Sequence, residues 1–439
     1  MNHLPGQKNS KQVFGFWTST SLVVGNMIGS GIFLLPSALA LYGGISIIGW
    51  IFTTSGAIFL SIVFMQLSKK FPKIGGPYAF AKNAFGNLSG FIVAYSYWIS
   101  IICGNAAISI ALVGYLSIFF PLIGESRLVS LISSFVSLWI LTIINLFGFR
   151  LSSRFQLVTA IIKVVLLVVI AFVGLFYFDY QHFVPFNLSH NNNFNAITAT
   201  ATLTLWAFLG LESATIPADK IKNADRVIPR VTILGTIIVA VVYILVTISI
   251  MGLIPANELA NSNAPFADSI KIILGSSASY ITAFIGVIAC AGALNGWILL
   301  QGQIPLAASL DNLFPNKFKL VSRNGTPIWG IIISSILISF LLIMNYTEGL
   351  VEQFTFVILV ATLATLLPFL FSAAAQLKFS LFVNKNKSFR GLIPITILAF
   401  LYSLWAVIGL GAKSILLGSI FISSGIPVYF FLIRRKMKV

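Results

Sequence analysis

Charged residues are scarce in this chain. Only 8% of its 439 residues are charged, whereas about a quarter of an ordinary soluble domain is. Hydrophobic residues make up 58% of the sequence. This composition excludes a soluble globular protein and is typical of a chain embedded in a membrane.

Histidine and cysteine are also few. His3, His182 and His190 all fall outside the apolar segments, and Cys103 and Cys290 fall inside them. The sequence therefore predicts no disulfide framework, no metal site and no catalytic pair buried in the membrane. It also lacks a nucleotide-binding G-x-x-x-x-G-K-[ST] loop, so no cofactor is expected and any transport would be driven by gradients. A receptor or an intramembrane enzyme stays an alternative class, although no soluble sensor domain is visible.

Acidic residues are outnumbered by basic ones, ten against 27, which gives a net charge of +17. The basic residues lie in short loops between apolar runs, which argues against a nucleic-acid partner. The apolar runs predict twelve membrane spans. Their centres lie near Ile28, Ala57, Ile102, Leu138, Val165, Trp206, Val241, Ala291, Ser335, Leu359, Phe400 and Ile422.

The loops between these spans alternate in charge. With a cytoplasmic N-terminus, 23 of the 27 basic residues fall in inside loops. Arg127, Lys271 and Lys413 fall outside, and Lys163 falls within a span. Basic residues concentrate on the cytoplasmic side of membrane proteins. The distribution predicts that both termini are cytoplasmic.

The first span contains the stretch G-N-M-I-G-S-G-I-F-L-L-P from Gly25 to Pro36. Gly29 and Gly31 destabilise a helix interior, because glycine has a low helix propensity. Broken backbone at membrane depth survives only where protein or a wet cavity satisfies its polar groups, and it marks the binding sites of transporters. The alternative is tight helix packing, because Gly25 and Gly29 also form a G-x-x-x-G face.

The sixth span is interrupted as well. It reads T-L-W-A-F-L-G-L-E-S, with Gly210 at its middle. Two glycine-interrupted spans five apart are the mark of two five-helix inverted repeats with a site between them. The predicted organisation is a cytoplasmic tail (1–12), a first repeat (13–176), an outside loop (177–195), a second repeat (196–377), a cytoplasmic loop (378–390), two further helices (391–433) and a cytoplasmic tail (434–439).

Two charged residues are predicted well within spans, Glu212 and Lys163. Such residues normally face the interior and mark an ion or substrate pathway. Glu212 could attract a cationic substrate, gate the path or carry a proton, or it could be a neutral acid that braces the broken helix. Lys163 could be a proton switch, or its ammonium could replace a bound cation and tie span five to the break. Alternatively it extends towards the cytoplasmic side.

Trp206 and Trp297 lie in the middle of spans, whereas membrane tryptophans usually gather at the interfaces. An indole near a broken helix could stack on a guanidinium or ammonium group. Ordinary packing is the alternative for each ring.

At these residues the chain resembles the amino acid–polyamine–organocation transporters (APC superfamily), most closely their bacterial arginine/agmatine antiporter branch. The likeness runs from span one to span eleven. Besides the two interrupted stretches, it includes G-G-P-Y-A-F-A-K-N-A-F-G from Gly75, Y-W-I-S-I-I-C-G-N from Tyr97, G-W-I-L-L-Q-G-Q from Gly296 and W-A-V-I-G-L-G-A-K from Trp405.

This resemblance implies an all-α membrane protein of the bacterial cytoplasmic (inner) membrane. The implied fold has twelve transmembrane helices in a 5+5 inverted repeat (LeuT-like) plus two helices, with helices 1 and 6 broken. It implies that the substrate carboxylate meets the amides of Ser30 and Gly31, and that its amino group meets carbonyls near Ile28, Trp206 and Leu209. The side-chain contacts implied are Trp206, Trp297, Asn105 and Ala361. The implied gate and pathway positions are Asn26, Tyr97, Glu212 and Phe354.

The chain departs from that branch at four positions. Ala361 stands where the branch has a serine, Ile102 replaces a gate tryptophan, and Phe369 replaces a gate tyrosine. The branch lacks a lysine at the position of Lys163. The spacing of Arg154, Gln156 and Lys163 is similar to that in the wider family, which includes proton-coupled members. The sequence therefore predicts no enzyme but a secondary transporter. The predicted transporter is an exchanger of arginine or a related cationic amino acid or amine. The alternative prediction is a proton-coupled symporter of neutral amino acids with Lys163 as the proton switch. Its partners would be this small molecule and membrane lipid, with a homodimer as one option.

Overall fold

The computed structural model describes residues 14–322, 325–346, 348–383 and 391–436. Within them the chain is helical, apart from turns and one isolated parallel bridge between Phe14 and Ile221. Ten segments of the described chain are long and apolar enough to cross a membrane, whereas twelve spans were predicted. The predicted spans centred on Ser335 and Phe400 correspond to two shorter apolar helices, α13 (Ile328–Asn345) and α16 (Ile393–Gly409).

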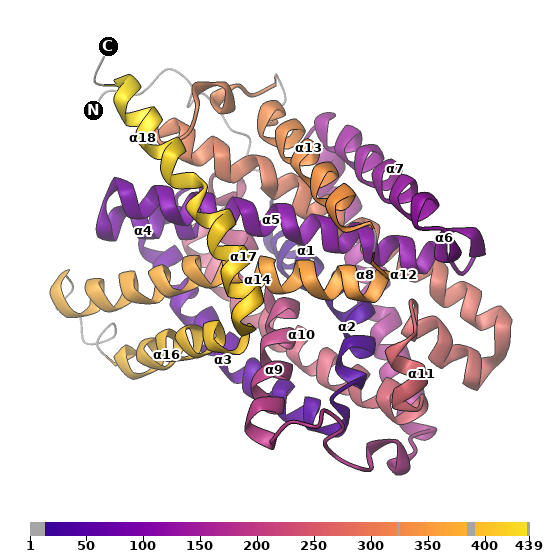
Figure 1. The fold of residues 1–439 in the computed structure, drawn as a ribbon. Helices are drawn as coiled ribbons and strands as arrows, with labels where there is room; N and C mark the ends of the chain where they lie inside the picture. Colours follow the sequence, from indigo (N-terminus) through magenta and orange to yellow (C-terminus); the bar gives the residue numbers. More distant parts are fainter. Residues whose placement is uncertain (1–13, 323–324, 347, 384–390, 437–439) are drawn as a thin grey trace.

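The first half of the chain starts with two short helices in place of one long one (Figure 1). Its helices are α1 (Phe16–Met27), α2 (Ser30–Ala40), α3 (Ser46–Lys70), α4 (Pro77–Phe85), α5 (Asn87–Leu116), α6 (Pro121–Glu125), α7 (Arg127–Leu146) and α8 (Phe149–Phe176), with 3₁₀ turns η1 (Gly43–Ile45) and η2 (Tyr180–Phe183).

The second half begins with another interrupted segment. It comprises α9 (Asn193–Leu205), the 3₁₀ turns η3 (Trp206–Phe208), η4 (Ser213–Thr215) and η5 (Ala218–Lys220), α10 (Ala224–Leu253), α11 (Ala256–Ala260), α12 (Pro265–Leu310), η6 (Asn316–Lys319), α13, α14 (Leu350–Lys378), a π-turn η7 (Phe379–Val383), α16, α17 (Gly411–Ser423) and α18 (Gly425–Lys436). The predicted tail at 1–12, the last three residues of the predicted tail at 434–439 and most of the predicted loop at 378–390 lie outside the described residues.

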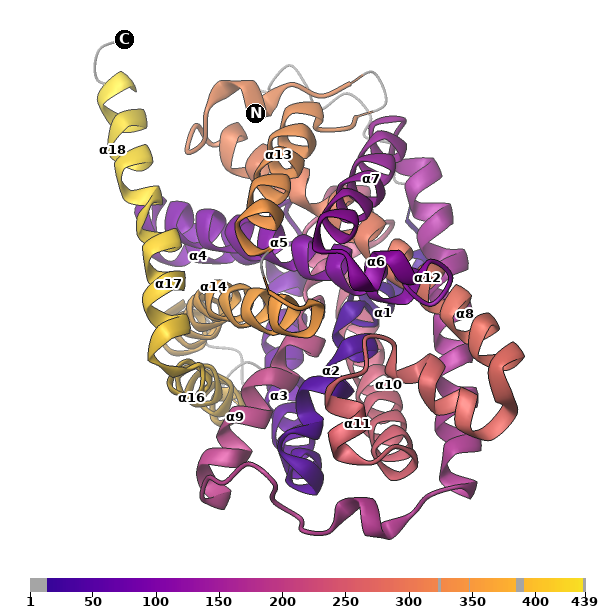
Figure 2. The same ribbon diagram turned by 45° about the vertical axis from the view of Figure 1, so that its right-hand side comes forward.

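The broken first segment forms the centre of the molecule. The most apolar 18-residue stretch of Phe16–Ala40 is 100% buried, whereas that of Ser414–Phe431 is 17% buried. α1 packs against α8, α10 and α12, and α2 against α5, α11 and α12. α5 and α14 run side by side in both views (Figures 1 and 2), and Figure 2 shows α17 and α18 along one flank of the molecule. The last two helices therefore add little to the packing around the break.

The two cysteines are free and buried, Cys103 on α5 and Cys290 on α12. The outward faces of the long helices carry many exposed aliphatic and aromatic side chains, for example Ile140, Phe172 and Phe340. In a membrane these faces meet lipid, which removes the cost of exposing them to water. The distribution fits an integral membrane protein whose polar groups gather inside.

Candidate functional site

The first span is interrupted where the glycine-rich stretch predicts a break. α1 ends at Met27, Ile28 and Gly29 have non-helical backbone angles, and α2 begins at Ser30. The structure shows both a broken helix and close packing at these glycines. A Cβ at Gly25 would overlap the amide of Gln156, and one at Gly29 would lie 3.1 Å from Ala293 Cβ. The glycines thus permit the break and also the close packing around it.

The last four carbonyls of a helix lack partners within it. At the end of α1 each of them has a donor, and three of these donors are side chains from other helices. Val24 O accepts from Ile28 N (2.8 Å), Gly25 O from Lys163 Nζ of α8, Asn26 O from Trp297 Nε1 of α12 (3.1 Å), and Met27 O from the hydroxyl of Tyr243 of α10. The surrounding helices therefore stabilise this break.

The second break lies directly against the first. η3 ends at Phe208, and Gly210 has a φ of +113°. A Cβ at Gly210 would lie 3.1 Å from Asn26 C and from Met27 N. Only glycine combines this left-handed backbone with so close an approach. Leu209 and Ile28, the predicted carbonyl positions, are both buried at these breaks.

The side chain of Asn26 joins the two breaks to α8. Its Nδ2 donates to Ser213 Oγ at 3.1 Å, and its Oδ1 accepts from Gln156 Nε2 at 3.1 Å. Gln156 and Lys163 lie seven residues apart on α8 and therefore on the same face. Both contact the last turn of α1. α8 thus holds the broken end through one amide and one ammonium.

Glu212 is fully buried beside the second break. Its Oε1 accepts from the hydroxyl of Tyr97 on α5, and its Oε2 accepts from the backbone N–H of Gly210 at 3.3 Å. Tyr97 and Glu212, each predicted as a gate position, therefore contact each other. In the described part of the chain Lys163, which is also fully buried, is bonded to Gly25 O rather than to a carboxylate.

Trp206 lies between the start of α2 and the middle of α5. A Cβ at Gly31 would be 3.2 Å from Trp206 Cδ1, and a Cβ at Gly104 would be 3.0 Å from Trp206 Cη2. The absence of side chains at Gly31 and Gly104 makes room for the ring. Trp297 sits on α12 with its N–H directed to Asn26. Both predicted tryptophans thus adjoin the breaks.

The remaining predicted contacts lie on α5 and α14. Asn105 Nδ2 donates to Gln301 Oε1 at 2.7 Å, and Gln301 in turn reaches Ser335 Oγ of α13 at 3.0 Å. Ala361 and Phe354 are fully buried on α14, which packs against α2, η3 and α5. These helices form the walls around the breaks.

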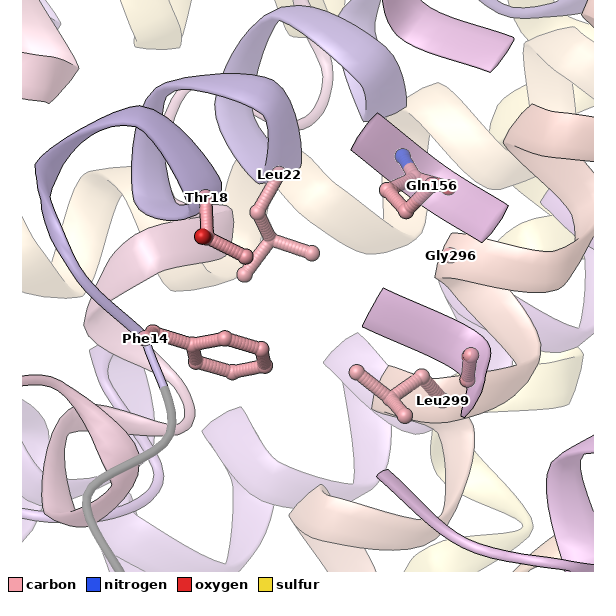
Figure 3. A pocket seen from close by; sticks show the side chains of 7 residues that line it. Phe14, Thr18, Leu22, Gln156, Gly296 and Leu299 are labelled. Carbon is pink, nitrogen blue, oxygen red and sulfur yellow. The ribbon is translucent and has the colours of Figure 1, made fainter. Parts of the chain in front are cut away.

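Two cavities of very different size lie among the described residues. Beside α1, Phe14, Thr18, Leu22, Ser152, Gln156, Gly296 and Leu299 line a crevice of about 10 Å³ (Figure 3), roughly the room that one water needs. The other cavity, of about 430 Å³, lies around α11 and is lined by Ile254, Glu258, Ser262, Asp268, Lys271 and Ile272. None of the residues predicted to bind the substrate lines either of these two cavities.

Sequence reasoning missed several partners of the breaks. Tyr243 and Ser213 carry no local signal, because each bonds to a residue far away in the sequence. Gln156 was singled out only for its spacing from Lys163. Their shared helix face would have indicated a common target on α1.

Comparisons with known proteins agree on one family. The family model described as amino acid permease matches residues 14–433. The cadaverine/lysine antiporter of Escherichia coli (strain K12) is 34% identical, with 98% of this chain and 96% of that protein covered.

Two putrescine transporters, both named PotE, are also similar. The one from Haemophilus influenzae is 32% identical over 94% of this chain and 95% of its own length. The one from Escherichia coli (strain K12) is 32% identical over 93% of this chain and 94% of its own length. With a matched region that spans nearly all of its residues, the chain belongs to the amino acid permease family of the APC superfamily.

Proposed function

We propose that this protein exchanges a cationic amino acid for a decarboxylated amine across the membrane by alternating access. The observation that carries the proposal is the contact between the two breaks, where Gly210 lies against Asn26 and Met27. Two opposed breaks place helix-end amides and carbonyls together inside the molecule. The names of the similar proteins, antiporters and carriers of lysine, cadaverine and putrescine, support a cationic substrate class.

In this proposal the breaks hold the backbone-like end of the substrate. Amides of Ser30 and Gly31 donate to its carboxylate, because the N–H groups in the first turn of α2 have no acceptor within the helix and lie at its positive dipole end. Carbonyls of Ile28, Trp206 and Leu209 accept from its amino group. The side-chain walls are Trp206, Trp297, Asn105 and Ala361, and the gating and coupling residues are Asn26, Tyr97, Lys163, Glu212 and Phe354.

The proposed architecture has twelve crossings. The ten long spans are joined by α13 and α16, whose 17 to 18 residues are near the lower limit for crossing a bilayer. The spans up to α8 form one five-helix unit, those from α9 to α14 form its inverted counterpart, and α16 with α17–α18 adds the last two. Both termini are cytoplasmic, in the bacterial inner membrane.

The test is exchange in liposomes that contain the purified protein. Vesicles loaded with agmatine, cadaverine, putrescine, arginine, lysine or a neutral amino acid are offered labelled arginine or lysine outside. Uptake should require a cationic substrate inside, and the arginine/agmatine and lysine/cadaverine pairs rank the two candidate substrates. Equal uptake into empty vesicles, or a preference for neutral amino acids, would refute cationic exchange.

A second candidate function is proton-coupled symport of neutral amino acids. The observation that favours it is the fully buried Lys163, whose ammonium contacts Gly25 O at the end of the broken helix. Loss of its proton would weaken that contact and release α1. In the symporter, net uptake follows an imposed pH gradient, and Lys163→Ala abolishes that dependence. Pure exchange that continues in Lys163→Ala, with no effect of a pH gradient on the wild type, excludes it.

A further inference from the structure

The indole N–H of Trp206 is buried and has no hydrogen-bond partner among the described residues. The residue is 8% exposed. Trp98, Trp139 and Trp297 each donate their indole N–H to a protein acceptor. A buried donor left without an acceptor is costly, so this N–H calls for an acceptor that arrives with a ligand. Trp50 also lacks a partner, but its ring packs between Phe208 and Tyr243.

The orientation of the Trp206 ring shows where that acceptor would sit. The benzene edge faces α5, with Cη2 and Cζ3 at 3.0 and 3.5 Å from a Cβ built on Gly104. The opposite edge faces the start of α2, with Cδ1 at 3.2 Å from a Cβ built on Gly31. Nε1 is bonded to Cδ1 and lies on that same edge. The unpartnered N–H is therefore next to the first turn of α2.

The first turn of α2 offers donors of the same kind. Its amides have no acceptor within the helix, and α2 is 11 residues long, so its dipole adds a positive partial charge at this end. Backbone N–H groups and an indole N–H on one spot suit an anion. They cannot bind an ammonium, because none of them can accept a hydrogen bond.

We infer that Trp206 is a specificity-determining residue that donates its indole N–H to the substrate carboxylate, beside the amides of α2, and so favours an amino acid over its decarboxylated amine. This inference rests on the proposed function, in which both kinds of molecule enter one site. An amine such as cadaverine lacks the acceptor, so it leaves the N–H unpaired. The same indole therefore sets the two affinities apart.

The experiment compares two matched pairs, lysine with cadaverine and arginine with agmatine, by competition binding to the purified full-length protein. One variant is Trp206→Phe. The other replaces Trp206 by β-(3-benzothienyl)alanine, which keeps the shape of the ring and has sulfur in place of N–H. Lysine and arginine should bind about 10- to 100-fold more weakly, as expected for a lost hydrogen bond to a charged group. Cadaverine and agmatine should bind nearly as in the wild type.

Trp297→Phe is the matched control. Its N–H already donates to Asn26 O, so its loss should weaken each amino acid and its amine alike. Equal weakening of both in the Trp206 variants, or greater weakening of the amines, would overturn the inference. A wild type that binds the amines but not the amino acids would also overturn it and leave amine transport standing. A wild type that binds none of the four refutes the proposed function itself.

Discussion

At the scale of single residues, the contacts of the buried acid Glu212 can be tested most directly. Glu212 receives two donors, the Tyr97 hydroxyl and the Gly210 amide. Removing a hydrogen-bond donor from a buried acid lowers the free energy of unfolding by about 1–3 kcal/mol. We predict that Tyr97→Phe lowers the exchange rate about tenfold or more and lowers thermal stability in detergent, because Glu212 loses the partner that joins α5 to the second break. Liposome exchange and thermal unfolding measure the two effects.

Trp98→Phe is the control for that variant. Trp98 is the next residue on α5, and its N–H donates to Ser334 Oγ of α13 at 2.7 Å, away from Glu212. Its loss should lower stability by a similar amount and leave exchange largely intact. If the two variants impair exchange equally, the contact between Tyr97 and Glu212 has only a structural role.

At the scale of elements, transport depends on the fit between α2 and η3. A Cβ at Gly31 would lie 3.1 Å from Ala207 Cα and 3.2 Å from Trp206 Cδ1. We predict that Gly31→Ala pushes these segments apart, costs about 1–3 kcal/mol of overpacking and reduces substrate affinity in binding assays. Gly15→Ala is the control, because nothing lies within 4 Å of its added Cβ. Wild-type affinity in Gly31→Ala would show that the site lies elsewhere.

Another element contact joins α4 to the end of α12. Asp311 Oδ2 accepts from the Tyr78 hydroxyl and pairs with Lys82 Nζ, both at 2.6 Å. Burial and the neighbouring carboxylate raise the pKa of Tyr78 well above its usual range, so its hydroxyl stays a donor at physiological pH. Lys82 and Asp311 are partly exposed.

We predict that Lys82→Ala costs only about 0–1 kcal/mol of unfolding free energy, as partly exposed ion pairs do. Asp311→Ala should cost about 1–3 kcal/mol, because it leaves the buried Tyr78 hydroxyl without its acceptor. Chemical denaturation of both variants in detergent gives the comparison. A larger effect of Lys82→Ala would mean that charge pairing, and not the tyrosine, holds α4 in place.

At the scale of the whole molecule, the sequence predicts composition-driven features well and tertiary pairing poorly. Glycines at Gly29 and Gly210 mark both breaks, because few other residues tolerate such backbone. Glu212 and Lys163 stand out as charges in apolar runs. The bond from Tyr243 to Met27 joins residues 216 apart, and it depends on how α10 packs against α1. No local pattern encodes such a contact, and the same holds for the bond from Asn105 to Gln301.

The topology of the whole molecule gives the last prediction. Cys103 and Cys290 are buried, so a cysteine introduced at an exposed loop position reports its own side of the membrane with little background. Lys73, Asn191, Lys317 and Glu348 are exposed. With cytoplasmic termini and twelve crossings, a membrane-impermeant maleimide added to intact cells should label Asn191→Cys and Glu348→Cys only. In inside-out vesicles it should label Lys73→Cys and Lys317→Cys only. The pair Lys317 and Glu348 flanks α13, so labelling of both from one side would mean that this short helix does not cross, and the proposed inverted repeat would lose a member.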